Sequence, residues 1–328
     1  MYRIREGEYK DVPAVVLEND VLKVAITHEH GARTASIIYK PQKRELLWQN
    51  PDPVHACPGY GAGYEDGEFA GFDEMFPTIS RCFYETGPWA GTEMPDHGEV
   101  WTLPWEYTKA GDGGSATFTV YGVRFPYRLS KTVRLTGIDG TVFHSEYRIE
   151  NLSRYDLDFI WAAHPLFNTH EGMRIIVPEG MDRIVNAVPG KTLGPYGREK
   201  PFPAGTGRDL SFVPEKNDVG YQKYYFSGKV REGWCLLYSP EWKLNIALSF
   251  PEETVPYLGV WLNEGGLAGQ YNIAPEPATG AMDRVDFSKM WGMSSTLKGS
   301  DSMSWFLSLA LKEGEQSTWF KNLDIGTL

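Results

Sequence analysis

The sequence predicts an all-β protein, built either as a large antiparallel sandwich or as a closed barrel. Three observations favour this class. Apolar residues recur with a period of two, which is the strand period. The 328 residues include 35 glycines and 22 prolines, which punctuate the chain and leave little room for long helices. Aromatic residues, which are enriched in strands, make up 14% of the chain.

Two kinds of pattern predict individual strands along the chain. Short apolar runs bounded by turn residues predict strands over residues 21–26, 116–120, 157–163, 234–239, 244–250 and 257–262. Alternation of apolar and polar residues predicts three further strands, each with one solvated face, over residues 128–135, 143–150 and 303–311. In the last of these, Trp305, Leu307 and Leu309 share one face, opposite two serines.

Two stretches show no strand pattern. Residues 51–98 are rich in glycine, proline and aromatic residues, and residues 178–218 are rich in proline, glycine and charge. Long ordered loops of this kind are usually functional. No low-complexity linker and no repeat divides the chain, so residues 1–328 are expected to form one domain.

Composition excludes several classes of partner. Asp and Glu number 43 against 32 Lys and Arg, so the net charge of −11 disfavours nucleic acid. The N-terminus lacks an apolar signal region and no apolar run reaches about 18 residues, which predicts a cytoplasmic protein with no membrane partner. Cys57, Cys82 and Cys235 lack metal-ligand spacing, so neither disulfides nor a zinc site are expected.

Three segments combine an ionisable side chain with unusual neighbours. In residues 95–101, His97 precedes a glycine, which allows another backbone or a ligand to approach closely. In residues 161–167, His164 ends an apolar run at a proline. In residues 272–280, Glu276 lies between two prolines that bias it toward extended geometry. Each group alone also has an ordinary structural explanation.

Together the three segments resemble the aldose 1-epimerase or galactose mutarotase superfamily. The order is His97-Gly98 followed by Pro104-Trp105, then His164-Pro165, then Glu276-Pro277. Residues 71–77 and 258–266 support the likeness, which spans nearly the whole chain. The resemblance implies the galactose mutarotase-like supersandwich, a large antiparallel β-sandwich with its active site in a cleft on a sheet face.

The resemblance also implies an isomerase that interconverts the α and β anomers of a free sugar. It assigns Glu276 as the base that takes the proton of the anomeric hydroxyl and His164 as the acid that protonates the ring oxygen. His97 then stabilises developing charge. Neither a metal nor an organic cofactor is expected. The acidic segment at Asp73 and Glu74 replaces an Asn-Arg pair of the family, which favours an uncharged sugar or an amino sugar.

Further residues are candidates for substrate binding. Three aromatic side chains are candidates for an apolar floor under the sugar, with core packing as the alternative: Phe72, Trp101 and Trp261. Four polar side chains are candidates for hydroxyl recognition: Asp73, Glu74, Asp96 and Asn263. For Asp96, a solvated loop position is the competing interpretation.

Two alternative functions stay open at this point. The first is a sugar-binding or sensing protein that keeps the pocket without turnover. The second is a glycoside hydrolase or lyase, in which Glu276 would act with Glu74 or Asp96, because hydrolysis usually needs two carboxylates about 5 to 9.5 Å apart. In each case the expected partner is a small-molecule sugar, and the protein is expected to be a monomer or a homodimer.

Overall fold

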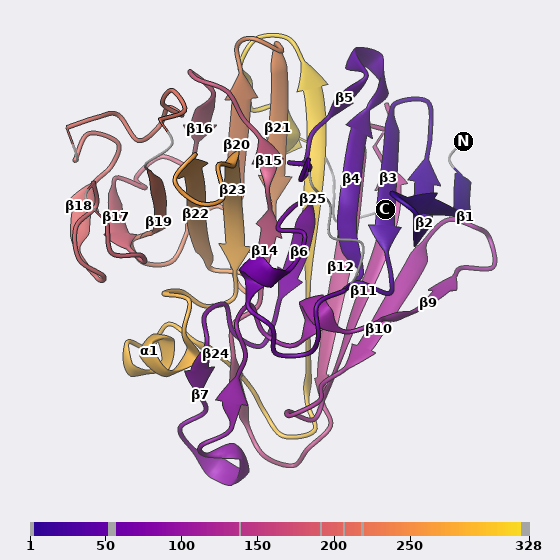
Figure 1. Cartoon of the computed structure of the whole chain (residues 1–328), viewed down its shortest axis with the longest axis vertical. Helices are drawn as coiled ribbons and strands as arrows, with labels where there is room; N and C mark the ends of the chain where they lie inside the picture. The colour runs from indigo at the N-terminus through magenta and orange to yellow at the C-terminus, as the bar shows by residue number, and fades with distance from the viewer. Residues whose placement is uncertain are drawn as a thin grey trace.

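A computed structural model describes residues 3–51, 57–137, 139–190, 192–205, 207–217 and 220–322. Most of its strands belong to two large sheets, which overlap in the view of Figure 1. Adjacent strands in both sheets run antiparallel. None of the helices in the described ranges is long and apolar enough to cross a membrane.

The larger sheet has 13 strands. Its spatial order is β1 (Arg3–Tyr9), β2 (Val12–Glu18), β3 (Leu22–Thr27), β4 (Arg33–Tyr39), β6 (Phe72–Met75), β14 (Ala162–Pro165), β23 (Tyr271–Ala278), β22 (Tyr257–Glu264), β19 (Tyr221–Phe226), β17 (Arg183–Asn186) and β18 (Glu199–Pro201). Two short strands flank this path, β5 (Arg44–Glu45) beside β4 and β15 (Phe167–Asn168) beside β23.

The second sheet has eight strands. Its order is β16 (Arg174–Ile176), β20 (Trp234–Ser239), β21 (Leu244–Ser249), β25 (Ser302–Glu313), β12 (Val142–Asn151), β11 (Tyr127–Thr136), β10 (Ala116–Tyr121) and β9 (Glu106–Lys109). The remaining elements are short: the pair β13 (Leu157–Phe159) and β24 (Ser295–Leu297), the pair β7 (Cys82–Phe83) and β8 (Glu93–Met94), the helix α1 (Val285–Met290), and the 3₁₀ turns η1 (Lys40–Gln42), η2 (Tyr64–Asp66), η3 (Gly87–Trp89), η4 (Val100–Thr102) and η5 (Trp319–Asn322).

The core lies between the two large sheets. On β11, burial alternates strictly, and Tyr127, Leu129 and Val133 are fully buried among apolar side chains of both sheets. Two separate sheets with their own edge strands form a sandwich. The predicted antiparallel β-sandwich is therefore confirmed, and the closed barrel is not what the chain forms.

The strand predictions need four corrections. The strand predicted over 157–163 is two strands, β13 and β14, which belong to different sheets. The supposed loop 51–98 contains β6, a central strand, and the supposed loop 178–218 contains β17 and β18. His144 was expected on the solvated face of β12, but it is buried beside the Phe306 ring and bonds Ser308 Oγ at 2.7 Å.

The strand β23 contains two prolines in the middle of a sheet, where proline normally removes a ladder hydrogen bond. The structure accommodates Pro275 and Pro277 because pairing on that side of β23 is interrupted. β14 contacts it at Ala278 and β15 contacts it at Ile273 and Asn272, which leaves the prolines between the two contacts. Glu276 is thereby held in a rigid, extended segment at the centre of the sheet.

Candidate active site

The centre of the larger sheet carries a row of residues from five neighbouring strands. Asp73 on β6 pairs with His164 on β14. Glu276 on β23 pairs with Gly259 on β22, which lies opposite Tyr225 on β19. Because residues directly opposite each other in antiparallel strands share a face, the members of each group point to the same side of the sheet.

The register between β14 and β23 joins the two groups into one row. Ala162 lies opposite Ala278, so counting two residues along each antiparallel strand places His164 opposite Glu276. The side chains meet accordingly, with His164 Nε2 3.7 Å from Glu276 Oε1. Two of the three residues predicted to do chemistry are thus adjacent because of strand register, although 112 positions separate them in the sequence (from 164 to 276).

Glu276 is fully buried beside Lys223, which also forms an ion pair with Asp283. Lys223 Nζ lies 2.8 Å from Glu276 Oε2 and 3.2 Å from Asp283 Oδ1. The Tyr225 hydroxyl donates a 2.6 Å hydrogen bond to the same Asp283 oxygen. Neither Glu276 oxygen accepts a well-directed hydrogen bond. The carboxylate therefore interacts with Lys223 and His164 through charge and proximity rather than through aligned hydrogen bonds. The Glu276 carboxylate is thus paired with one ammonium rather than enclosed by directed hydrogen bonds.

The surroundings move the pKa values of the two central groups in opposite directions. Burial raises the pKa of Glu276 to about 7, and the nearby Lys223 ammonium offsets part of that rise. Burial lowers the pKa of His164 well below its ordinary value, and the His97 and Lys223 charges lower it further. Lys223 is itself buried, but the Asp283 and Glu276 charges outweigh desolvation and raise its pKa. At neutral pH the imidazole is therefore neutral, whereas the Glu276 carboxyl titrates in the neutral range.

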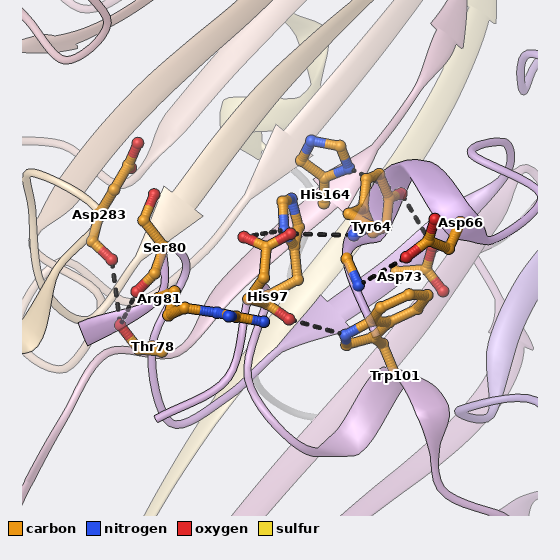
Figure 2. Close-up of polar contacts among 12 residues, drawn as sticks. Tyr64, Asp66, Asp73, Thr78, Ser80, Arg81, His97, Trp101, His164 and Asp283 are labelled. Carbon is orange, nitrogen blue, oxygen red and sulfur yellow. Dashed lines mark hydrogen bonds and ion pairs between the residues drawn. The ribbon is translucent and has the colours of Figure 1, made fainter. Parts of the chain in front are cut away.

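Tyr64 joins the row from the segment that precedes β6. Its hydroxyl donates a 2.9 Å hydrogen bond to Asp73 Oδ2 and lies 3.2 Å from His164 Nδ1. Figure 2 shows the Tyr64 ring beside His164 and near Asp73 and Trp101. Burial raises the pKa of Asp73 to about 6, although a nearby Arg33 and the Tyr64 hydrogen bond oppose the shift.

His97 is held against this tyrosine by its backbone. The two rings stack with centroids 4.0 Å apart and an interplanar angle of 9°. His97 has a φ of 56° and Gly98 a φ of 79°, and a Cβ at Gly98 would lie 2.0 Å from the Phe76 carbonyl oxygen. Glycine is required there because the backbone of Phe76, the residue just after β6, approaches so closely. On its other side, His97 Nδ1 lies 3.2 Å from Asp96 Oδ1.

These residues surround a cavity of about 200 Å³. The His97 and His164 rings lie on its wall with centroids 5.5 Å apart. Glu276 lies beneath, in contact with two of the lining residues, His164 and Lys223. The full lining is Tyr64, Glu65, Phe69, Ile79, Ser80, Asp96, His97, His164, Val188, Lys223, Trp261, Leu267 and Asp283.

The structure brings five of the predicted site residues to this cavity: His97, His164, Asp96, Trp261 and, beneath it, Glu276. Asp73 and Trp101 lie behind Tyr64, where they line a much smaller hollow. The Trp101 indole donates to the Asp96 carbonyl oxygen at 3.0 Å, and its ring meets the Tyr64 ring edge to face. Both residues therefore support the wall of the cavity rather than line it.

Three predicted substrate contacts do not reach the cavity. Phe72 and Glu74 flank Asp73 on β6, so they point to the opposite side of the sheet, into the core between the sheets. There Glu74 forms an ion pair with Lys131 Nζ and accepts hydrogen bonds from the Tyr147 hydroxyl and the Trp161 indole, each at 2.9 Å.

The third of these residues is Asn263, which stabilises a turn. Its amide donates to the Leu267 carbonyl at 2.8 Å and its oxygen accepts from the Gly265 and Leu267 backbones. Glu74 and Asn263 are thus structural groups, and the proposed pairing of Glu276 with Glu74 for glycoside hydrolysis is wrong, because Glu74 is enclosed in the core.

Sequence reasoning missed three residues of the site: Tyr64, Lys223 and Asp283. Tyr64 lies in a loop that contains several aromatic residues, and nothing in the sequence distinguishes it from the others as a site residue. Lys223 belongs to the run Tyr221–Phe226, which contains no recognisable motif. Lys223 and Tyr225 are two positions apart in this strand, so their side chains lie on the same face of the sheet. Within the described ranges, no group of three or more His, Cys, Asp or Glu side chains is placed to hold a metal ion.

Comparisons with known proteins agree with this architecture. A scan against protein-family models and a search of curated proteins found no match. Among solved structures, a protein from Synechocystis sp. PCC 6803 superposes with a TM-score of 0.68 at 18% identity, covering 95% of this chain and 100% of its own. A galactose mutarotase related enzyme from Lactobacillus acidophilus gives 0.65 at 16% identity, covering 93% and 99%. A galactose mutarotase-like protein from Lactobacillus casei ATCC 334 gives 0.60 at 19% identity, covering 91% and 100%.

These similarities extend over nearly the whole of each chain, at low sequence identity. They establish the fold: the chain is a galactose mutarotase-like β-sandwich. A fold hosts several chemistries, so the activity has to be argued from the site itself.

Proposed function

We propose that this protein is an aldose 1-epimerase, an isomerase that interconverts the α and β anomers of a free sugar. The observation that carries the proposal is the buried pair of His164 and Glu276 at 3.7 Å, beside a cavity of monosaccharide size. A carboxyl group and an imidazole whose environments shift their pKa values in opposite directions form an acid–base pair at one pH.

The reaction needs one proton removed and one delivered. A base takes the proton of the anomeric hydroxyl while an acid protonates the ring oxygen, the bond between C1 and the ring oxygen breaks, and the open-chain aldehyde forms. Closure on the other face of the aldehyde returns both protons. In the proposed assignment Glu276 is the base and His164 the acid, so the proton of the pair has to lie on His164 Nε2 when the ring opens. Glu276 Oε1 and His164 Nε2 lie 3.7 Å apart, so this proton passes through one water or after the two side chains approach each other.

Two features of the cavity support an uncharged sugar or an amino sugar as substrate. Its volume of about 200 Å³ is below the roughly 300 Å³ at which pockets for drug-sized ligands begin, which favours a single sugar ring. Its lining carries the carboxylates of Glu65, Asp96 and Asp283 against the one ammonium of Lys223, which disfavours sugar phosphates and uronates. Trp261 offers an apolar surface to the sugar ring. We also propose a cytoplasmic location, because a protein of this function would act on free sugars.

A panel of freshly dissolved sugars tests the activity. We expect the protein to accelerate anomer exchange for at least one uncharged or amino aldose, measured by polarimetry and by saturation-transfer NMR. If no sugar on the panel exchanges faster, the proposal is rejected. Saturable binding by calorimetry without exchange would instead identify a sugar-binding or sensing protein.

The pH dependence of catalysis gives a second test. The pair of His164 and Glu276 holds one proton when Glu276 is protonated, and it loses that proton as pH rises through about 7, the pKa of Glu276. Above that pH the pair has a base but no acid. We therefore expect the catalysed kcat/KM to fall as pH rises from about 6.5 to about 8.5, with an apparent pKa of about 7. A catalysed rate that rises across this range, after subtraction of the uncatalysed rate, would contradict the assignment.

A further inference from the structure

Asp73, Tyr64 and His164 form a chain of hydrogen bonds that ends at the acid–base pair. The Tyr64 hydroxyl connects Asp73 Oδ2 at 2.9 Å to His164 Nδ1 at 3.2 Å. The three residues are nearly enclosed, with 3% to 4% of their surface exposed. The other ring nitrogen, Nε2, faces Glu276. The chain therefore approaches the imidazole from the side opposite to the groups that would react.

Donor and acceptor roles in this chain follow from counting protons. A tyrosine hydroxyl has one proton, and an ionised carboxylate can only accept. The Tyr64 proton therefore goes to Asp73, and its oxygen is left to accept from His164 Nδ1. In the neutral imidazole only one nitrogen carries a proton, so Nδ1 is protonated and Nε2 is left with a lone pair.

We propose that Tyr64 is a positioning residue, which uses the Asp73 carboxylate to keep the His164 proton on Nδ1 and Nε2 open toward Glu276 and the substrate. This inference rests on the proposed epimerase function for its kinetic consequences. When His164 Nε2 takes up a proton during the reaction, the same chain stabilises the imidazolium, because its far end is negatively charged.

Other groups also face His164 and have to be considered. Glu276 on β23, His97 on the neighbouring loop and Lys223 on β19 surround it, and Arg33 on β4 lies near Asp73. Nδ1 instead contacts the Tyr64 hydroxyl, and the Glu276 carboxylate lies on the side of Nε2. Burial raises the pKa of Asp73 to about 6, so the carboxylate is ionised at neutral pH, as the chain requires.

The variant Tyr64→Phe isolates the hydroxyl. The ring packs against His97, Phe69 and Trp101, and phenylalanine keeps these contacts. We expect kcat to fall by about 10- to 100-fold with little change in KM, the range seen when an outer partner that orients a histidine is removed. The control Tyr60→Phe removes another hydroxyl of the same segment, which bonds Glu99 at 2.5 Å, and should leave kcat unchanged.

A double-mutant cycle tests whether the two outer residues act as one chain. Asp73→Asn should lower kcat in the same direction, and the double variant Tyr64→Phe, Asp73→Asn should be no slower than Tyr64→Phe alone. Losses that multiply would show that the residues act separately and would overturn the proposal. So would a Tyr64→Phe variant that folds normally and keeps the kcat and pH profile of the parent protein.

The tautomer can be measured without any turnover. Nitrogen-15 NMR of histidine-labelled protein, with His164 assigned through His164→Gln, should show Nδ1 protonated and Nε2 unprotonated. In Tyr64→Phe the proton should move to Nε2. Protonation of Nε2 in the parent protein would overturn the inference. Because this readout needs no substrate, it separates failure of the inference from failure of the proposed epimerase activity, which the sugar panel decides.

Discussion

Replacing Glu276 with glutamine is expected to slow catalysed anomer exchange by about 10²- to 10⁴-fold, the range typical for loss of a positioned proton-transfer group. Glutamine has nearly the same shape but neither takes up nor releases a proton near neutral pH. Lys223 keeps its contact with Asp283 at 3.2 Å, so the buried ammonium retains a counter-charge and the fold should persist. Sugar affinity should change much less than the rate.

Saturation-transfer NMR on the best sugar of the panel measures this effect, with calorimetry for affinity and thermal unfolding for integrity. Glu253→Gln is the matched control, because Glu253 is an exposed glutamate outside the cavity lining. Exchange that continues at the parental rate in a folded Glu276→Gln protein would contradict the acid–base assignment. A comparable loss in Glu253→Gln would show that the effect is not specific to the site.

Replacing Lys131 with methionine is expected to lower the free energy of unfolding by about 3 to 5 kcal/mol, the cost of leaving a buried charge without its partner. Lys131 Nζ and Glu74 Oε1 lie 2.9 Å apart, and both side chains are fully buried. Methionine fills the space of the lysine stem but removes the ammonium. Urea unfolding followed by tryptophan fluorescence measures the change.

The double variant Lys131→Met, Glu74→Gln provides the control. Removing the second charge should recover a large part of the loss, because the glutamine oxygen can still accept from the Trp161 indole while its amide nitrogen donates to the Tyr147 hydroxyl oxygen. A single variant that loses less than about 1 kcal/mol would show that the pair is not the desolvated ion pair the structure describes. Anomer exchange by the folded double variant should match the parent, as Glu74 lies outside the cavity.

Much of the fold follows from local patterns in the sequence. Alternation over residues 128–135, 143–150 and 303–311 identified the strands β11, β12 and β25, and short apolar runs identified β3, β10, β20, β21 and β22. An alternating strand has one face in the core, so its side chains carry a visible period of two, whereas β20, β21 and β22 are buried on both faces and appear as apolar runs. β6 and β23 lacked this signal, because four-residue β6 is too short to show a period and β23 contains two prolines.

The alternation of side chains along a strand also bears on the three substrate contacts predicted at β6. Phe72, Asp73 and Glu74 are consecutive, so they cannot all face one cavity in a strand. The sequence offered no sign that these residues form a strand, since they lie in a glycine-rich and proline-rich stretch. Once β6 is placed beside β14, Asp73 turns to the site, and Phe72 and Glu74 turn to the core.

The sequence by itself determined the class of fold and, through three short motifs, the groups proposed to carry the chemistry: His97, His164 and Glu276. Only the tertiary structure decided which other residues join them. Tyr64 and Lys223 reach the site because strand register and a long connection bring distant segments together. The physical reason is that proton transfer depends on distances of a few ångströms between side chains, and in an antiparallel sheet those distances are set by the pairing of strands remote in sequence.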